Sequence, residues 1–280
     1  QMAVEELFLY GVEQERDGKE EAAAEIYEQV LGRDPRHISA LLKMAWRSYR
    51  AADFQRAEGY IARALARDGS DPGIHYVAGV VYRAAQRWGL AQDALWAAIR
   101  YGGPPAPAYA QLGEIAIHQK RHDEAASVLR RARSFHPDDA LVLADLAVAL
   151  RLAGKTTEAT SAVNEALEKM PLLPFALAEK ARLTPATVSG TSERWKRILG
   201  YDVENFLEAA AWYRRLDDQA SVDFVLQAAL KAIPASSTSA LLHYYLASAA
   251  RKEGKTEVAQ KHAEQASATP YVKVFPHRLE

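Results

Sequence analysis

Residues 109–137 read YAQLGEIAIHQKRHDEAASVLRRARSFHP and contain the pattern that decides the fold. A small residue, a small–large–small triplet and a helix stop follow one another in this stretch. They are Gly113, then Ala125, Leu129 and Ala132, then Pro137. Separations of three and four residues place side chains on one face of an α-helix. The stretch therefore predicts two helices joined by a turn, packed closely because small side chains of one helix lie against large ones of the other.

The same pattern returns every 34 residues in five consecutive units without insertion. The small position of the first helix holds Gly11, Ala45, Gly79, Gly113 and Ala147. The first small position of the second helix holds Ala23, Ala57, Ala91, Ala125 and Ala159, and its bulky position holds Tyr27, Ile61, Leu95, Leu129 and Val163. Each unit ends on a helix stop, at Pro35, Gly69, Gly103, Pro137 and Pro171. Such a period predicts an array in which each helical hairpin buries its apolar face on its neighbours.

The period and the columns together resemble the tetratricopeptide repeat family over residues 3–171. One departure is Gln14, which stands where the family prefers an aromatic residue, whereas the third unit has Tyr82 at its aromatic position. The resemblance implies an all-α fold, a right-handed α-solenoid of helix-turn-helix units. It also implies that partners bind along the concave face lined by the first helices.

The repeat register changes after Pro171. We expect about eight hairpins in all, of which the sixth is degenerate. The predicted segments are five regular units at 3–171, the degenerate unit at 172–201 with a loop at 184–191 and a short helix at 192–200, two further hairpins at 202–270, and a non-repeat tail at 271–280.

A second resemblance concerns the C-terminal part of the chain. The stretches YAQLGEI at 109–115, LLHYYLA at 241–247 and FPHRLE at 275–280 are similar to the C-terminal tetratricopeptide array of a bacterial family of large proteins. That family carries an upstream β-rich domain similar to sugar mutarotases. The resemblance implies that the chain is a fragment, and that any carbohydrate chemistry belongs to the upstream domain.

The composition is that of an ordinary globular protein, with 49% hydrophobic and 25% charged residues. A net charge of −1 provides no field that would attract nucleic acid, so we expect no nucleic-acid partner. We also expect no membrane span, because no apolar run approaches the roughly 20 residues that a spanning helix needs. The absence of cysteine excludes disulfides and thiolate sites. No leader sequence is visible, which favours a cytoplasmic location.

The motifs of catalysis are missing from the sequence, so we expect no enzyme, no metal and no cofactor. His118 and His122 are four residues apart, but we place His122 in a turn and expect two solvated histidines. The adjacent carboxylates at 138–139 and 217–218 begin helices, where acidic residues favour the helix dipole. The arginines at 130–133 point in different directions, which indicates a solvated face.

Candidate binding residues are the first-helix side chains that the repeat does not use for packing. They are Trp46, Tyr49, Arg50, Tyr76, Arg83, Glu114, His118 and Arg151. Aromatic residues and arginine are enriched at interface hot spots, so this set suits a peptide or partner domain carrying an acidic group. The alternative for Trp46 and Tyr76 is that they only pack on the next unit. For the function we expect a protein-interaction scaffold, and the alternative is a structural arm of a larger carbohydrate-related protein. A homo-oligomer formed through the ends of the array is a further expectation.

Overall fold

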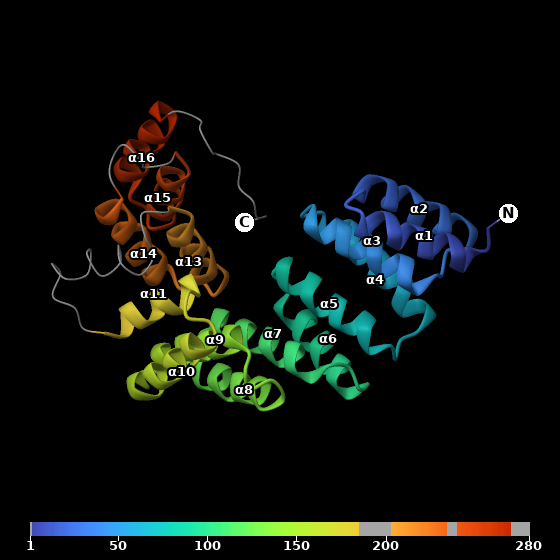
Figure 1. Cartoon of the computed structure of the whole chain (residues 1–280), viewed down its shortest axis with the longest axis horizontal. Coiled ribbons are helices and arrows are strands. Elements are labelled where there is room, and N and C mark those ends of the chain that lie inside the picture. Colours follow the sequence, from blue (N-terminus) through green and yellow to red (C-terminus); the bar gives the residue numbers. More distant parts are fainter. Residues whose placement is uncertain (1, 185–202, 234–239, 270–280) are drawn as a thin grey trace. The chain divides into compact units, whose positions relative to one another are not determined.

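The computed structural model describes residues 2–184, 203–233 and 240–269 (Figure 1). All regular elements of these residues are α-helices. They are α1 (Val4–Arg16), α2 (Glu20–Arg33), α3 (Ile38–Arg50), α4 (Phe54–Arg67), α5 (Pro72–Ala84), α6 (Trp88–Arg100), α7 (Pro105–His118), α8 (His122–Phe135), α9 (Ala140–Leu152), α10 (Thr156–Lys169), α11 (Pro174–Leu183), α13 (Val203–Arg215), α14 (Gln219–Ala232), α15 (Ala240–Lys252) and α16 (Thr256–Ala268). The predicted all-α fold of paired helices is confirmed. The short helix expected at 192–200 and the tail at 271–280 lie outside the described residues.

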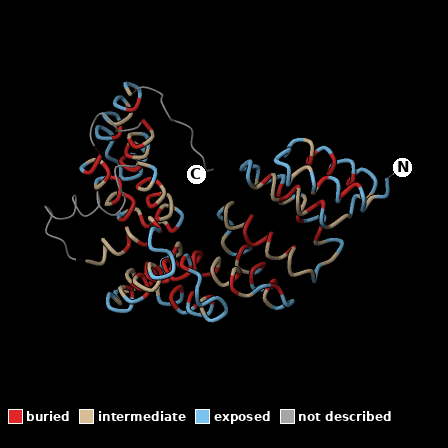
Figure 2. Tube along the Cα trace, viewed as in Figure 1, coloured by how far each residue is buried: buried red, intermediate tan, exposed pale blue. Residues whose placement is uncertain are grey.

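The chain divides into two compact units, residues 1–112 and 113–278, which we describe separately. The N-terminal unit contains the hairpins α1–α2, α3–α4 and α5–α6, and the C-terminal unit contains α8 to α16. The boundary falls within α7. In most helices the buried residues alternate with exposed ones along the helix, whereas α9 is buried without interruption over residues 142–150 (Figure 2). The buried residues form one cluster in the C-terminal unit and two clusters in the N-terminal unit.

Aspartate side chains cap the N-termini of several helices. The side chain of Asp71 accepts a hydrogen bond from the backbone N–H of Ile74 at 2.9 Å, and Pro72 occupies the first turn of α5. Asp139 accepts from the N–H groups of Leu141 and Val142 at 3.0 and 3.2 Å. These bonds satisfy backbone donors that a helix leaves free at its N-terminus.

The turn inside each described hairpin uses one residue in the left-handed region, and in the first five hairpins that residue recurs every 34 residues. The residues at this position are Gly18, Ala52, Gln86, Lys120, Gly154, Asp217 and Gly254, with φ from 54° to 78°. Glycine adopts this conformation without strain, whereas the other residues adopt it at some cost. The turn predicted between the two helices of a hairpin is therefore present, for example at Gly18, Ala52, Gly154 and Gly254.

Contact between the two helices of a hairpin explains the small and bulky columns. A Cβ atom added to Gly113 would lie 2.5 Å from Cγ of Leu129, and one added to Gly79 would lie 2.5 Å from Cγ of Leu95. Where the small column holds alanine instead, the bulky residue of the same core cluster is β-branched. The two cases are Ala45 with Ile61 and Ala147 with Val163. The columns are therefore matched in volume, as close packing in a protein core requires.

Candidate partner-binding surface

The N-terminal unit places three predicted site residues on α3 and two on α5. Trp46 and Tyr49 are half-buried against the core cluster that contains Ala45 and Ile61, and their rings meet edge to face with centroids 5.4 Å apart. The ring of Tyr49 also lies 6.3 Å from that of Phe54 in α4. On α5, Tyr76 and Arg83 are half-buried as well. Trp46 and Tyr49 thus contact the core and still keep part of their surface in solvent.

Charged side chains surround this aromatic group. Arg50 is exposed and its guanidinium lies 3.3 Å from the carboxylate of Glu20. Nearby, Glu15 of α1 accepts a hydrogen bond from the hydroxyl of Tyr27 at 2.7 Å and pairs with Lys43 at 2.7 Å. Burial opposes ionisation of Glu15, but the bonds from Lys43 and Tyr27 outweigh it and lower the pKa of its carboxyl. The face therefore contains fixed charges beside apolar rings.

In the C-terminal unit the first helices carry an acidic row, which consists of Glu114 in α7, Asp145 in α9 and Glu179 in α11. All three side chains are buried. The guanidinium of Arg215, at the end of α13, lies 3.4 Å from a carboxylate oxygen of Glu114 and 3.6 Å from one of Asp145. Buried carboxylates require such cations, because an unpaired charge in a core is strongly destabilising.

Two aromatic residues of α13 bind the acidic row directly. The indole Nε1 of Trp212 donates to Oδ1 of Asp145 at 2.7 Å, and the hydroxyl of Tyr213 donates to Oε2 of Glu179 at 2.7 Å. The Arg215 guanidinium carbon lies 3.9 Å from the centroid of the Trp212 ring, a cation–π contact. Side chains of the chain's own α13 therefore occupy the first-helix face of this unit.

Arg151 of α9 is the centre of a second set of buried polar contacts. Its Nε donates to Oε1 of Glu179 at 2.6 Å, and its Nη2 donates to Oδ2 of Asp218 at 2.5 Å and to Oγ of Ser221 at 3.2 Å. Burial opposes the positive charge, but the two carboxylates raise the pKa of Arg151, and Arg151 in turn helps to lower the pKa of Asp218 against the effect of burial. Arg151 is therefore satisfied within the fold.

The two histidines four residues apart are separated by the hairpin turn. His118 is the last residue of α7, and its Nδ1 lies 4.0 Å from Oδ2 of Asp217, which also pairs with Lys120 at 2.9 Å. His122 is the first residue of α8, so its placement in the turn was wrong. The turn ends before His122, not at it, because Lys120 takes the left-handed conformation and Arg121 is the N-cap of α8. Within the described ranges no group of three or more potential metal-ligating side chains is found.

Sequence reasoning selected Glu114 and Arg151 but missed the other members of these two polar groups. The residues that contact Glu114 or Arg151 directly are Glu179, Arg215, Asp218 and Ser221. Asp145 and Trp212 join the same region through Arg215 and through each other. A signal was available in α9, where Asp145 interrupts the apolar run of residues 140–150. A charged residue inside an apolar helix indicates a buried polar contact, although it does not identify the partner.

Comparison with known proteins agrees with this architecture. Residues 76–140 and 116–178 match two family models, each described as a tetratricopeptide repeat. No curated protein matches the chain at a significant level. Among the residues described here, the helices are too short or too polar to cross a membrane.

Several solved structures have a similar fold. A tetratricopeptide repeat protein from Parabacteroides merdae superposes with a TM-score of 0.61 at 14% identity, covering 96% of this chain and 94% of that one. PilW, described as a widely conserved type IV pilus biogenesis factor, gives a TM-score of 0.61 at 17% identity, with 81% and 99% of the two chains covered. YrrB, described as a tetratricopeptide repeat protein with an unusual peptide-binding site, gives 0.50 at 18% identity over 73% and 99%.

The fold and the matched segments together define the structural class of the protein. The chain is an all-α helical-repeat protein of the α-solenoid class, and such arrays serve in general as protein-interaction scaffolds. More particularly, it is a tetratricopeptide repeat protein.

Proposed function

We propose that the chain is a non-catalytic scaffold whose N-terminal unit binds a peptide segment of a partner protein. The binding surface is the aromatic face, which we define as Trp46, Tyr49 and Arg50 of α3 with Tyr76 and Arg83 of α5. The C-terminal unit is then a support whose first-helix face is filled by the chain itself.

One contrast between the units carries this proposal. In the C-terminal unit, Trp212 and Tyr213 of α13 contact the acidic row on earlier first helices. In the N-terminal unit, the main helix contacts join the two members of a hairpin or neighbouring hairpins. Among the described helices, those that pack against α3, with its half-exposed Trp46 and Tyr49, belong to the same or a neighbouring hairpin. A partner peptide would supply the contacts that α13 supplies in the other unit.

The residue types favour a partner of particular chemistry. Half-buried tryptophan and tyrosine offer large, rigid contact areas, and arginine offers planar hydrogen-bond donors for a carboxylate. The partner that fits is a short segment with an apolar side chain for the Trp46–Tyr49 pair and an acidic group for Arg50 or Arg83. Affinity would come mainly from the aromatic contacts, because exposed ion pairs contribute little.

A peptide selection tests the proposal. A random peptide library is selected against the chain, and the recovered peptides are titrated against variants by fluorescence anisotropy. We expect Trp46→Ala/Arg83→Ala to weaken binding by about 2–4 kcal/mol, the range of hot-spot residues. The matched control is Trp96→Ala/Arg100→Ala, which removes the same residue types from the second helix α6 of the same unit, where Trp96 is 38% exposed.

The control variant should bind like the wild type. Peptides that bind both double variants with equal affinity, or a selection that yields no peptide, would refute the aromatic face as the binding surface. Helical content measured by circular dichroism must match among the three proteins, so that loss of binding is not loss of fold.

The second candidate function is a structural arm within a larger carbohydrate-related protein. The observation that favours it is the occupied first-helix face of the C-terminal unit, because a face filled by its own chain has no room for a ligand. An arm of this kind would show no peptide binding in the selection, and its alanine variants would alter stability alone.

A further inference from the structure

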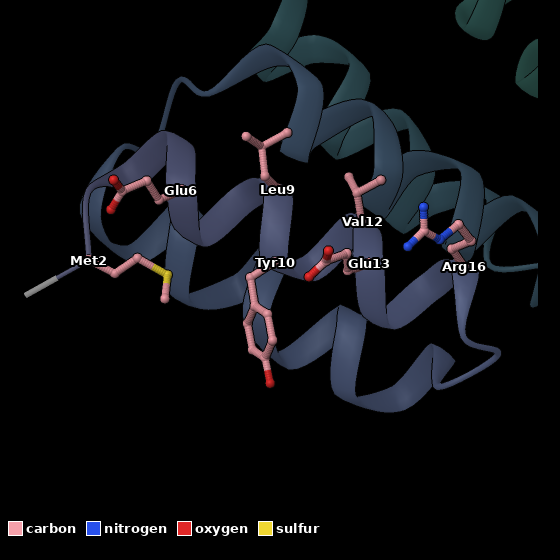
Figure 3. Close-up of a pocket in the computed structure, with 7 residues that line it drawn as sticks. All are labelled: Met2, Glu6, Leu9, Tyr10, Val12, Glu13 and Arg16. Atoms are coloured by element: carbon pink, nitrogen blue, oxygen red, sulfur yellow. The ribbon is translucent and has the colours of Figure 1, made fainter.

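An open hollow of about 530 Å³ runs along α1 and is lined in its middle by Leu9, Tyr10 and Val12 (Figure 3). Tyr10 has equivalents at intervals of 34 residues, and two of them, Met44 and Leu146, are buried. The hollow therefore lies on a face that the repeat uses for packing, and it is not a ligand site.

Two histidines of the hairpin α15–α16 have the chemistry of a ligand site. His243 of α15 and His262 of α16 are both half-buried, and their Nδ1 atoms lie 3.2 Å apart. The ring centroids are 5.4 Å apart and the ring planes differ by 25°, so the two Nδ1 atoms lie on the facing edges of the rings. One Nδ1 carries a proton and donates it, and the other accepts it through its lone pair. Both residues belong to one hairpin, so their contact requires no other part of the chain.

The repeat places apolar side chains at both of these positions. In the register of the alanine columns and the turn residues, the equivalents of His243 and His262 are Leu143 with Ala162 in α9–α10 and Phe206 with Val225 in α13–α14. All four equivalents are buried. A single histidine at such a position would bury a polar ring at a cost, whereas here both contacting positions change together. Departures of this kind from a local pattern are expected at functional sites.

The ionisation of the pair also suits a metal ligand. Burial lowers the pKa of His243, and the neighbouring His262 lowers it further. The neutral imidazole ring has a nitrogen lone pair available, and a metal ion binds histidine in this form. The contact therefore favours the form of His243 that can act as a ligand.

The separation of the two nitrogens fits one edge of a tetrahedral metal site. With Zn–N bonds of about 2.0–2.1 Å, two nitrogen ligands of one zinc ion lie about 3.3–3.4 Å apart. The χ2 torsion of histidine is broad, so small ring rotations can turn both lone pairs toward a common ion. We propose that His243 and His262 form a site for a divalent transition-metal ion, which both rings bind through Nδ1. The proton of the hydrogen bond moves to Nε2 of its own ring, so both rings stay neutral.

The ligand type selects the class of metal. Imidazole nitrogen suits Zn²⁺, Cu²⁺ and Ni²⁺, whereas Mg²⁺ and Ca²⁺ prefer oxygen. Among residues 2–184, 203–233 and 240–269 no group of three or more ligating side chains is found, so water or a group of a partner would complete the coordination. A bound ion would tie α15 to α16 and stabilise the folded hairpin.

The proposed site departs from the expectation of no metal. That expectation depended on motifs within single segments of sequence, whereas these two ligands are 19 residues apart on two helices. The site lies in the C-terminal unit and goes beyond the peptide binding proposed for the aromatic face.

Isothermal titration calorimetry with ZnCl₂, on the chain without a purification tag, tests the site. We expect one zinc ion to bind per chain. His243→Gln and His262→Gln each remove one ligand and should weaken binding at least about tenfold, because the loss of residues that merely support metal ligands already costs that much. The matched control His136→Gln removes an exposed histidine of the same unit and should bind zinc like the wild type.

Two further measurements separate loss of the ligands from loss of the fold. Zinc should raise the thermal midpoint of the wild type and of His136→Gln but not of the two ligand variants, and circular dichroism without zinc shows whether each variant is folded. Nitrogen NMR of the histidine rings in the wild type needs no variant and should show zinc at both Nδ1 atoms. A wild type that binds no zinc, affinity that both ligand variants retain, or coordination through other histidines would overturn the proposal.

Discussion

The guanidinium of Arg151 in α9 donates to the carboxylate of Asp218 at 2.5 Å, although the two residues are 67 positions apart. In a regular tandem array each hairpin contacts only its neighbours. This bond instead reaches past α10 and α11, and the contact between Lys120 and Asp217 spans 97 residues. The C-terminal unit is therefore held together by polar side chains that connect distant repeats, in addition to the apolar layer between adjacent ones.

Arg151→Met should destabilise the chain by about 3–5 kcal/mol, because it leaves the buried carboxylates of Glu179 and Asp218 without their cation. Denaturant unfolding monitored by circular dichroism measures the change. Arg130→Met is the matched control, since Arg130 pairs with Glu158 on the surface, where the side chains are 44% and 56% exposed. That change should cost at most about 1 kcal/mol. Equal effects of the two substitutions would show that burial of the pair does not matter.

Trp212→Phe should cost about 1–3 kcal/mol, because it removes the N–H donor and leaves Oδ1 of the buried Asp145 with one partner fewer. The phenyl ring keeps the stack on Phe175, whose ring centroid is 4.8 Å from that of Trp212. Trp96→Phe removes an indole N–H from the surface and should change stability by less than about 0.5 kcal/mol. Thermal unfolding compares both variants with the wild type, and an effect of Trp212→Phe no larger than that of the control would contradict the role assigned to the hydrogen bond.

Gly113→Ala should destabilise the C-terminal unit by about 1–3 kcal/mol, because the new Cβ overlaps Leu129. Gly59→Ala is the control, since nothing lies within 4 Å of a Cβ there, and alanine should stabilise that helix by about 0.5–1 kcal/mol. Adding Leu129→Val to Gly113→Ala copies the Ala147–Val163 combination of the next repeat. The double variant should recover part of the loss, and non-additivity in a double-mutant cycle measures the coupling.

Asp223→Asn should change how stability depends on pH. Burial and a hydrogen bond with Glu253 raise the pKa of the Asp223 carboxyl to about 6 from 3.8. A raised carboxyl pKa contributes stability that is present below about pH 3.8 and is lost as the pH rises through about 6. Asparagine removes this titration, so the variant should gain stability relative to the wild type between pH 4 and pH 7.5. The gain is on the order of 1 kcal/mol once solvent screening is allowed for.

Denaturant unfolding at both pH values gives this difference, in which groups common to the two proteins cancel. Glu253→Gln removes one cause of the raised pKa and should weaken the same pH dependence. A constant difference between Asp223→Asn and the wild type across the range would contradict the assignment.

Much of the fold was predictable because the repeat is local. The columns of Gly113, Ala125 and Leu129 specify how two adjacent helices pack, and that contact lies within 34 residues. The hairpin turns followed from the same register. The position of His122 was missed because helix boundaries depend on cap geometry at single residues.

The candidate site was predictable only in part. Periodicity assigned Trp46, Tyr49, Tyr76 and Arg83 to first helices, and the structure places them there half-buried. Periodicity assigned Glu114 and Arg151 to first helices in the same way, since they occupy the same positions of the 34-residue repeat as Trp46 and Tyr49. Nothing in their spacing distinguishes a residue that awaits a partner from one that is already bound within the chain.

The sequence by itself determined the secondary structure, the hairpin pairing and the matched volumes of the small and bulky columns, because these depend on contacts between residues close in the chain. The tertiary structure decided that Trp212, Tyr213 and Arg215 meet the acidic row and that Asp218 meets Arg151. Those contacts join residues 34 to 101 positions apart. They depend on where the chain goes after the repeat is interrupted, and no local periodicity encodes that path.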